Sequence, residues 1–136
     1  MILVDTNVLV AAAIETDTNH RPAAELLQTA SEGLLVPPTV VAETCYLLDR
    51  FGSPAVEAAF LRAFDAGQLE LVDLTVPDLA RMATLVEQYA DLRLGGTDAS
   101  LVAIAERLGI ERVATFNRRD FTVVAPAHVD HLTLLP

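Results

Sequence analysis

The chain begins Met1-Ile2-Leu3-Val4-Asp5-Thr6-Asn7, an apolar run that ends at a carboxylate. Residues 2–5 predict a short buried strand, and the stretch from Asn7 to about Ile14 predicts a helix. The same alternation of short apolar runs and longer helical patterns continues along the chain. Further strands are predicted at residues 34–36, 69–73, 112–116 and 131–135, and further helices at residues 22–31, 39–51, 54–67, 77–92 and 97–109.

Strands that are separated by helices require crossover connections, and these occur in parallel sheets. We therefore expect one α/β domain over residues 1–136, with a mainly parallel central sheet between two layers of helices. Thr39 and Thr97 are the expected N-caps of two of these helices. In such sheets ligands bind beyond the carboxyl ends of the strands, so the polar residues at those ends are the candidates for a functional site.

The composition is that of a folded, acidic protein. Hydrophobic residues make up 52% of the 136 residues, which excludes intrinsic disorder. The 19 acidic and 9 basic residues give a formal net charge of −10, which argues against general binding to nucleic acid. All 9 basic residues are Arg, so any mechanism that needs a lysine is excluded.

The sequence predicts a cytoplasmic protein without a membrane segment. Asp5 interrupts the first apolar run, and no basic region precedes that run, so we expect no signal peptide. The longest uncharged runs have about half of the ~20 residues that a membrane helix needs. Cys45 is the single cysteine, which fits a reducing compartment.

Three carboxylates are predicted at one edge of the sheet. Asp5 ends the first strand, and Glu43 lies one turn into the helix after the second strand, at the border of its apolar stripe. Asp98 shares a helix face with apolar side chains three, four and seven residues further on, so its charge is expected to point inward. Taken singly, Glu43 and Asp98 could serve only to complement a helix N-terminus. The joint placement of the three acids favours a functional site.

Asn117 and Asp120 follow the strand at residues 112–116 and add further oxygen atoms to the same edge. Carboxylates gathered there repel one another unless a cation lies among them. Mg²⁺ and Mn²⁺ prefer carboxylate and water oxygens, and are commonly held by one or two carboxylates together with a substrate phosphate. Zinc is not favoured, because the histidines do not cluster with the acids. A bound cation would activate water and stabilise charge on a phosphoryl group.

Four motifs together resemble those of the PIN-domain family. They are Asp5-Thr6-Asn7-Val8-Leu9 after the first strand, Val41-Ala42-Glu43, Thr97-Asp98-Ala99-Ser100 at the start of an Ala-rich helix, and Val113-Ala114-Thr115 followed by Asn117, Asp120 and Phe121. Their order and spacing are most similar to those of the VapC-type toxins of bacterial toxin–antitoxin pairs. The resemblance covers essentially the whole chain.

This resemblance implies a metal-dependent endoribonuclease that cuts RNA with water activated by Mg²⁺ or Mn²⁺ in a carboxylate cluster. Asp5 and Asp98 match the principal metal ligands of the family, and Glu43 matches the acid that helps to position metal or water. Asn7 and Thr115 match polar positions beside the ligands and are candidates for substrate binding. The family also implies a cognate antitoxin as partner, and a homodimer.

The sequence departs from the family pattern at Asn117, where many members have a fourth acid. An amide adds no negative charge, so the occupancy of a second metal site is in question, and Asp120 could fill the fourth acidic position. Arg118 and Arg119 flank this position and could bind RNA phosphate, since a guanidinium can bind two oxygens at once. A solvated turn is the alternative interpretation of these two arginines.

Receiver domains, phosphatases and phosphate-binding loops fit the sequence less well than this function. Receiver domains depend on a lysine that the chain lacks, and phosphatases that begin with a strand-end aspartate need Asp-x-Asp, whereas position 7 is Asn. Gly95-Gly96-Thr97 lacks the spacing of a phosphate-binding loop. A catalytically silent PIN-like module, which binds an antitoxin or RNA without cleaving it, stays open as the alternative hypothesis.

Overall fold

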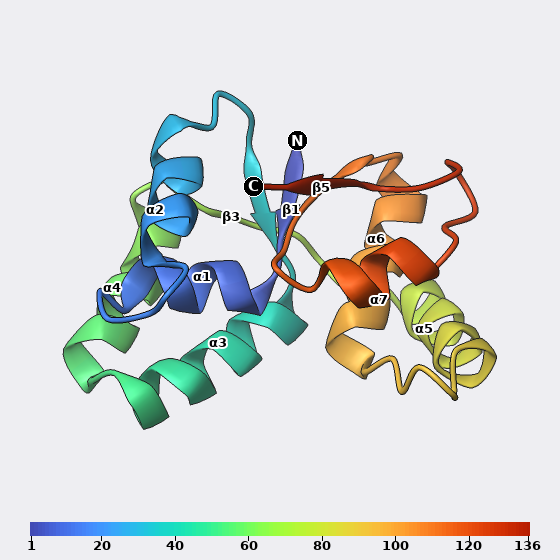
Figure 1. Ribbon diagram of the computed structural model, residues 1–136, viewed down its shortest axis with the longest axis horizontal. Helices are drawn as coiled ribbons and strands as arrows, with labels where there is room; N and C mark the ends of the chain where they lie inside the picture. Colours follow the sequence, from blue (N-terminus) through green and yellow to red (C-terminus); the bar gives the residue numbers. More distant parts are fainter.

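A single parallel sheet organises the computed structural model, which describes residues 1–136 (Figure 1). The strands are β1 (Ile2–Val4), β2 (Leu34–Val36), β3 (Glu70–Leu71), β4 (Arg112–Ala114) and β5 (Thr133–Leu135). The helices are α1 (Thr6–Ala13), α2 (His20–Thr29), α3 (Pro38–Phe51), α4 (Pro54–Asp65), α5 (Val76–Gln88), α6 (Gly96–Leu108) and α7 (Arg118–Val123). The strand order is β3-β2-β1-β4-β5, and every pairing is parallel, which confirms the predicted α/β fold.

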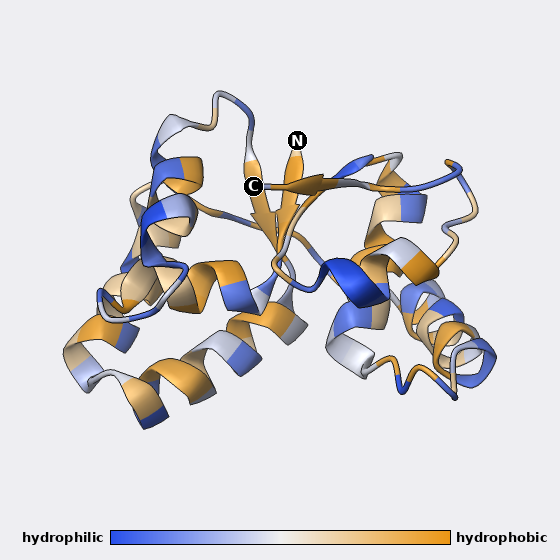
Figure 2. Ribbon diagram, viewed as in Figure 1, coloured by the Kyte–Doolittle hydropathy of each residue, from blue (hydrophilic) through white to orange (hydrophobic).

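The central strands are apolar because helices cover both faces of the sheet. Leu3, Val36 and Val113 are fully buried in β1, β2 and β4, and β1 and β2 are orange in the hydropathy view (Figure 2). Figure 1 shows α1 to α4 gathered on one side of the central strands and α5 to α7 on the other. The carboxyl ends of β1 and β4 therefore lie at the seam between two groups of helices.

Helix α6 is fixed to α5 by two ion pairs. Arg107 Nε donates to both carboxylate oxygens of Asp78, at 3.0 and 3.1 Å. Arg81 donates to both carboxylate oxygens of Glu106, at 2.8 and 2.9 Å. Asp78 also closes a capping box with Thr75 at the start of α5. These contacts give α6 a fixed position relative to the rest of the molecule.

Several element boundaries differ from the predictions. Neither Thr39 nor Thr97 is an N-cap, because α3 begins at Pro38 with Pro37 as its cap and α6 begins at Gly96 with Gly95 as its cap. The predicted strand at residues 69–73 is reduced to the two residues of β3. The six-residue helix α7 was not predicted, since it is too short to show a helical period in the sequence.

The length and hydropathy that a membrane-crossing helix requires are found in none of the seven helices.

Candidate active site

Asp5 lies at the carboxyl end of β1, as predicted, and is also the N-cap of α1. Its Oδ1 accepts a hydrogen bond of 2.7 Å from the backbone N–H of Thr6. Its Oδ2 accepts bonds from the Thr115 hydroxyl at 2.7 Å and from the Asn7 amide at 3.0 Å. Burial raises the pKa of Asp5, although these hydrogen bonds oppose the rise. Both carboxylate oxygens are thus fixed in place by the fold itself.

Asn7 and Thr115 hold in place both the side chain of Asp5 and the backbone that follows β4. The Thr115 hydroxyl accepts from the backbone N–H of Asn117 at 3.0 Å, and the Asn7 side-chain oxygen accepts from the backbone N–H of Phe116 at 3.0 Å. Thr115 is fully buried, and its hydroxyl bonds Asp5 and the backbone of Asn117 inside the protein. Its role toward a substrate stays a prediction.

Asp98 lies in the first turn of α6, where it is half-buried, and its side chain makes no hydrogen bond. Burial raises its pKa to about 7, and the negative charges of Asp5, Asp120 and Glu43 add to the rise. Asp5, Glu43 and Asp120 are therefore close enough to act on Asp98, as expected for acids at one edge of the sheet. The inward direction predicted for Asp98 agrees with its partial burial.

Glu43 is exposed and lies beside the buried stripe of α3, three residues after Val40. The buried stripe of α3 is narrow and consists of Val40, Thr44 and Leu48. Glu43 is nevertheless held in place, because its Oε2 accepts a hydrogen bond of 2.9 Å from the hydroxyl of Thr97 in α6. An exposed carboxylate tied to the residue before Asp98 remains available to solvent and to a substrate.

Asp120 provides the fourth carboxylate of the cluster. It is buried in the first turn of α7, and its two oxygens accept from the Asn117 amide at 2.9 Å and from Arg119 Nε at 3.0 Å. The hydrogen bond from Asn117 lowers the pKa of Asp120, and Arg119 lowers it further against the effect of burial. Arg118 is directed elsewhere, since its guanidinium donates to the carbonyl of Pro136 at 2.6 Å.

The chemistry of these side chains fits a hard divalent cation. No three His, Cys, Asp or Glu side chains converge closely enough to form a complete metal cage. The groups that share this edge of the sheet are all oxygen donors, which Mg²⁺ and Mn²⁺ prefer. Mg²⁺ needs only one or two carboxylates besides water and substrate. The carboxylate of Asp98, which has no hydrogen bond and faces three negative charges, is the group that a cation would stabilise most.

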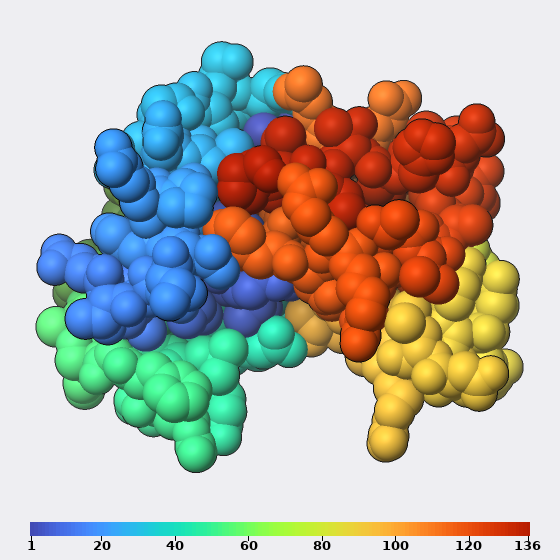
Figure 3. Space-filling view, viewed as in Figure 1, coloured from blue at the N-terminus to red at the C-terminus, as the bar shows by residue number.

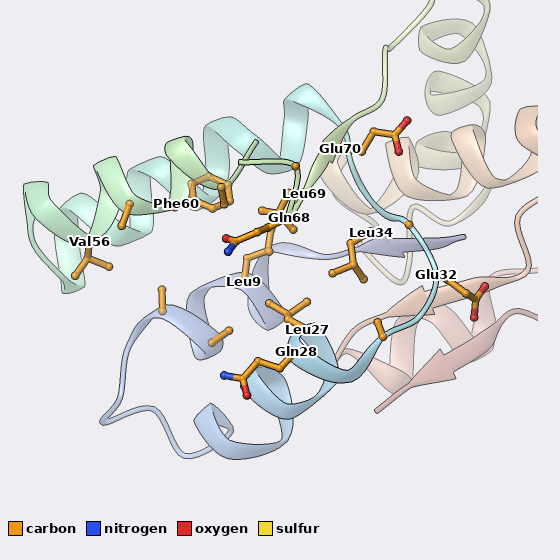
Figure 4. A pocket seen from close by; sticks show the side chains of 17 residues that line it. Leu9, Leu27, Gln28, Glu32, Leu34, Val56, Phe60, Gln68, Leu69 and Glu70 are labelled. Carbon is orange, nitrogen blue, oxygen red and sulfur yellow. The ribbon is translucent and has the colours of Figure 1, made fainter. Parts of the chain in front are cut away.

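A cavity of about 860 Å³ lies outside the site formed by Asp5, Glu43, Asp98 and Asp120 (Figure 4). Leu9, Leu27 and Phe60 give it an apolar wall between α1, α2 and α4. It reaches Gly33 and Leu34, at the amino end of β2, whereas Asp5 stands at the carboxyl end of the neighbouring parallel strand. This cavity is therefore separate from the carboxylate site.

Comparison with known proteins agrees with this geometry. The PIN domain family model matches residues 2–126. The chain belongs to the PIN domain family. Ribonuclease VapC26 of Mycobacterium tuberculosis is 30% identical to this PIN domain over 135 residues, which cover 99% of this chain and 100% of that protein. The resemblance to VapC-type proteins predicted from the four motifs is confirmed.

Solved structures of similar proteins share the fold of this PIN domain. VapC20 of Mycobacterium tuberculosis, described as a sarcin-ricin loop cleaving toxin, superposes with a TM-score of 0.84 at 19% identity, over 95% of this chain and 98% of that chain. One chain of a toxin–antitoxin complex from Klebsiella pneumoniae gives a TM-score of 0.69 at 18% identity, over 98% of this chain and 100% of that chain. At these identities the likeness shows the fold alone.

Two polar residues to which the sequence assigns no role in the site lie in the helices of Glu43 and Asp98. The hydroxyls of Thr39 in α3 and Ser100 in α6 are 2.6 Å apart, and Ser100 is fully buried. One feature of the sequence indicates such a contact, since the polar Ser100 lies within the otherwise apolar buried run from Ala99 to Ala105. Most buried hydroxyls have a hydrogen-bond partner, and Ser100 has two, Thr39 in the neighbouring helix and the carbonyl of Thr97 in its own.

Replacing Asn117 with Asp is expected to destabilise this PIN domain by about 1–2 kcal/mol, because the variant loses the amide that donates to Asp120 and places two carboxylates together. Thermal unfolding of N117D at pH 7 in EDTA measures the loss. N117S is a suitable control, since it removes the amide without adding a charge and should lose less. A variant as stable as the wild type would mean that the Asn117–Asp120 bond contributes little.

Proposed function

We propose that this PIN domain is a VapC-type endoribonuclease toxin that hydrolyses RNA phosphodiester bonds with Mg²⁺ or Mn²⁺. The observation that carries the proposal is the environment of Asp98, a carboxylate without a hydrogen bond whose pKa is raised by burial and by three neighbouring acids. A protein does not keep such a cluster for stability, because like charges in a partly buried site are unfavourable. The ribonuclease relative at 30% identity supports the same activity.

Asp5 and Asp98 are the proposed metal ligands. A bound Mg²⁺ or Mn²⁺ would lower the pKa of water and offset the negative charge that develops on the phosphate. Asp5 needs no rearrangement to bind, because Thr6, Asn7 and Thr115 already hold its side chain. The remaining acids, Glu43 and Asp120, have separate roles.

Glu43 is proposed to orient the attacking water or to accept its proton. Its carboxylate is exposed and anchored at one oxygen by Thr97, so the other oxygen is free to face solvent. Asp120 is proposed to fill the fourth acidic position, with Asn117 as its anchor. Its pKa lies below the ordinary value, so it carries its charge throughout the neutral pH range.

Arg119 is the proposed contact for RNA phosphate. Its side chain is 79% exposed, and it is paired with Asp120, so it lies next to the acidic cluster. The space-filling view shows an open notch between α3 and the chain that joins α5 to α6, the elements adjoining Glu43 and Asp98 (Figure 3). Arg118, by contrast, supports the carboxyl end of β5 through its bond to Pro136.

We also propose a cytoplasmic protein that forms a homodimer and binds a cognate antitoxin. The toxin–antitoxin complex with the same fold supports the antitoxin. The net charge of −10 suits a basic antitoxin segment. Leu71, Val76 and Leu79 are 60%, 79% and 49% exposed near the edge strand β3, and this apolar surface supports a second copy as partner.

The purified chain, freed of any partner, is expected to cut structured RNA in Mg²⁺ or Mn²⁺ and to stop when EDTA is added. D5N and D98A should each lower the rate at least about 100-fold, because each removes a proposed metal ligand. Gel analysis of an end-labelled RNA measures both effects. D65N, which changes an exposed acid on α4, is the matched control and should cut at the wild-type rate.

Two outcomes would contradict the proposal. Cleavage that persists in D98A would exclude the carboxylate cluster as the catalytic site. A folded wild-type chain that cuts no RNA would favour the silent module, which binds an antitoxin or RNA without cleaving it.

A further inference from the structure

Two hydrogen bonds join α3 to α6 at the start of both helices. Ser100 donates to the backbone carbonyl of Thr97 at 2.6 Å, which uses its single hydroxyl proton. The 2.6 Å contact between the hydroxyls of Thr39 and Ser100 must therefore have Thr39 as the donor. The second bond runs from the Thr97 hydroxyl to the Glu43 carboxylate at 2.9 Å.

The spacing of the four residues places these bonds one helical turn apart. Thr39 and Glu43 are four residues apart and share one face of α3. Thr97 and Ser100 are three residues apart and share one face of α6. We call the four side chains the α3–α6 bridge. Asp98 lies in α6 between its two members of the bridge, so the bridge spans the seam where the acids meet.

The bridge acts against a repulsive force. Asp98 and Glu43 are both acids near the starts of α6 and α3, and Thr97, the residue before Asp98, bonds Glu43, so their negative charges repel at short range. Helix α6 is fixed on its far side by α5, through the ion pairs of Arg107 and Arg81. Helix α3 packs against α1 and α4, on the other side of the seam. Without the bridge, repulsion would favour a wider separation of the two carboxylates.

We propose that Thr39, Thr97 and Ser100 are positioning residues, which hold Glu43 at the separation from Asp98 that a cation bound by Asp98 and a water oriented by Glu43 require. This inference rests on the proposed function. Ser100 contacts neither substrate nor metal, because it is fully buried and its bonds are to Thr39 and the Thr97 carbonyl. Thr97 acts directly on Glu43, by fixing one of its oxygens.

Isosteric variants of the bridge test this role by calorimetric titration of the full chain with Mn²⁺. S100A and T39V remove the Thr39–Ser100 bond with little change in volume. We expect each to weaken Mn²⁺ binding about tenfold, as is usual when a group that orients a metal ligand is lost. T39S keeps the hydroxyl and should restore wild-type affinity. Steady-state RNA cleavage should show a higher Mn²⁺ requirement, with most of the rate recovered at saturating Mn²⁺.

T44V is the matched control. Thr44 is fully buried in the same helix, and its hydroxyl has no hydrogen-bond partner, so the change to Val should leave Mn²⁺ affinity unaltered. Wild-type Mn²⁺ affinity in S100A and T39V, even with a lower melting temperature, would overturn the inference and leave the proposed function intact. Absence of Mn²⁺ binding by the wild type would overturn both.

Discussion

Asp98→Asn is expected to make the metal-free protein more stable, by about 1–2 kcal/mol at pH 8. The carboxylate of Asp98 is half-buried among three other acids, and the amide removes its charge at nearly constant shape. For a chain of this size the gain corresponds to a melting temperature about 3–8 °C higher. Thermal unfolding in EDTA measures it.

The pH dependence gives this prediction a definite sign. The pKa of Asp98 is about 7 in the folded protein and near 3.8 in the unfolded chain. The unfolded chain therefore loses this proton first, and the stability of the wild type falls as the pH rises from about 4 to 7. The D98N variant does not show this decrease in stability with rising pH. The difference between the two proteins should be absent near pH 4 and fully developed at pH 8.

Mn²⁺ should reverse the order of stability. Wild-type protein gains about 2.7 kcal/mol when free Mn²⁺ reaches 100 times its dissociation constant, whereas D98N gains much less. D65N, with its exposed carboxylate on α4, should behave as the wild type in EDTA and in Mn²⁺. If D98N and wild type respond equally to Mn²⁺, Asp98 is not a metal ligand.

Asp78→Ala is expected to cost about 3 kcal/mol of folding free energy, because it breaks a buried ion pair and a helix cap together. Asp78 is 3% exposed, accepts both bonds from Arg107 Nε, and bonds the backbone of Thr75. Chemical denaturation at pH 7 measures the loss. D73A is the matched control, since Asp73 lies 3.5 Å from the same arginine but is 78% exposed, and its loss should cost under about 1 kcal/mol.

Acid should remove the contribution of Asp78. Burial would raise the pKa of this carboxyl, but the hydrogen bonds from Arg107 and Thr75 outweigh it, so the pKa lies below the ordinary value of 3.8. A lowered pKa stabilises the folded protein above about pH 4, and the effect is lost as the pH falls through the folded value. The gap between wild type and D78A should therefore narrow at pH 3. A difference in stability between wild type and D78A that does not change with pH would mean that lost packing, and not lost charge, causes the destabilisation.

The sheet and the first acids could be predicted because each depends on local sequence. Short apolar runs separated by helical stretches favour parallel pairing of the strands. The parallel sheet of β1 to β5 confirms this prediction. Asp5 and Asp98 were found because one ends a strand and the other interrupts an apolar helix face. Both signals lie within a few residues of the acid itself.

The contacts between segments could not be predicted in the same way. Thr39 and Thr97 have the residue type of an N-cap, but their hydroxyls bond Ser100 and Glu43, which lie 61 and 54 residues away. The spacing of residues within one helix does not indicate which residues of another helix they contact across the seam. Helix α7 left one local signal, since Asn117 accepts from the backbone N–H of Asp120 three residues later, as an N-cap does.

The bond between Thr115 and Asp5 has a consequence for the order in which the protein is made. The two residues are 110 positions apart, so a ribosome that has already synthesised Asp5, Glu43 and Asp98 has not yet made the strand that fixes Asp5. Strand β4, at the centre of the sheet beside β1, is also absent at that stage. The nascent chain therefore holds the acids without the proposed site, which is assembled only as synthesis nears completion.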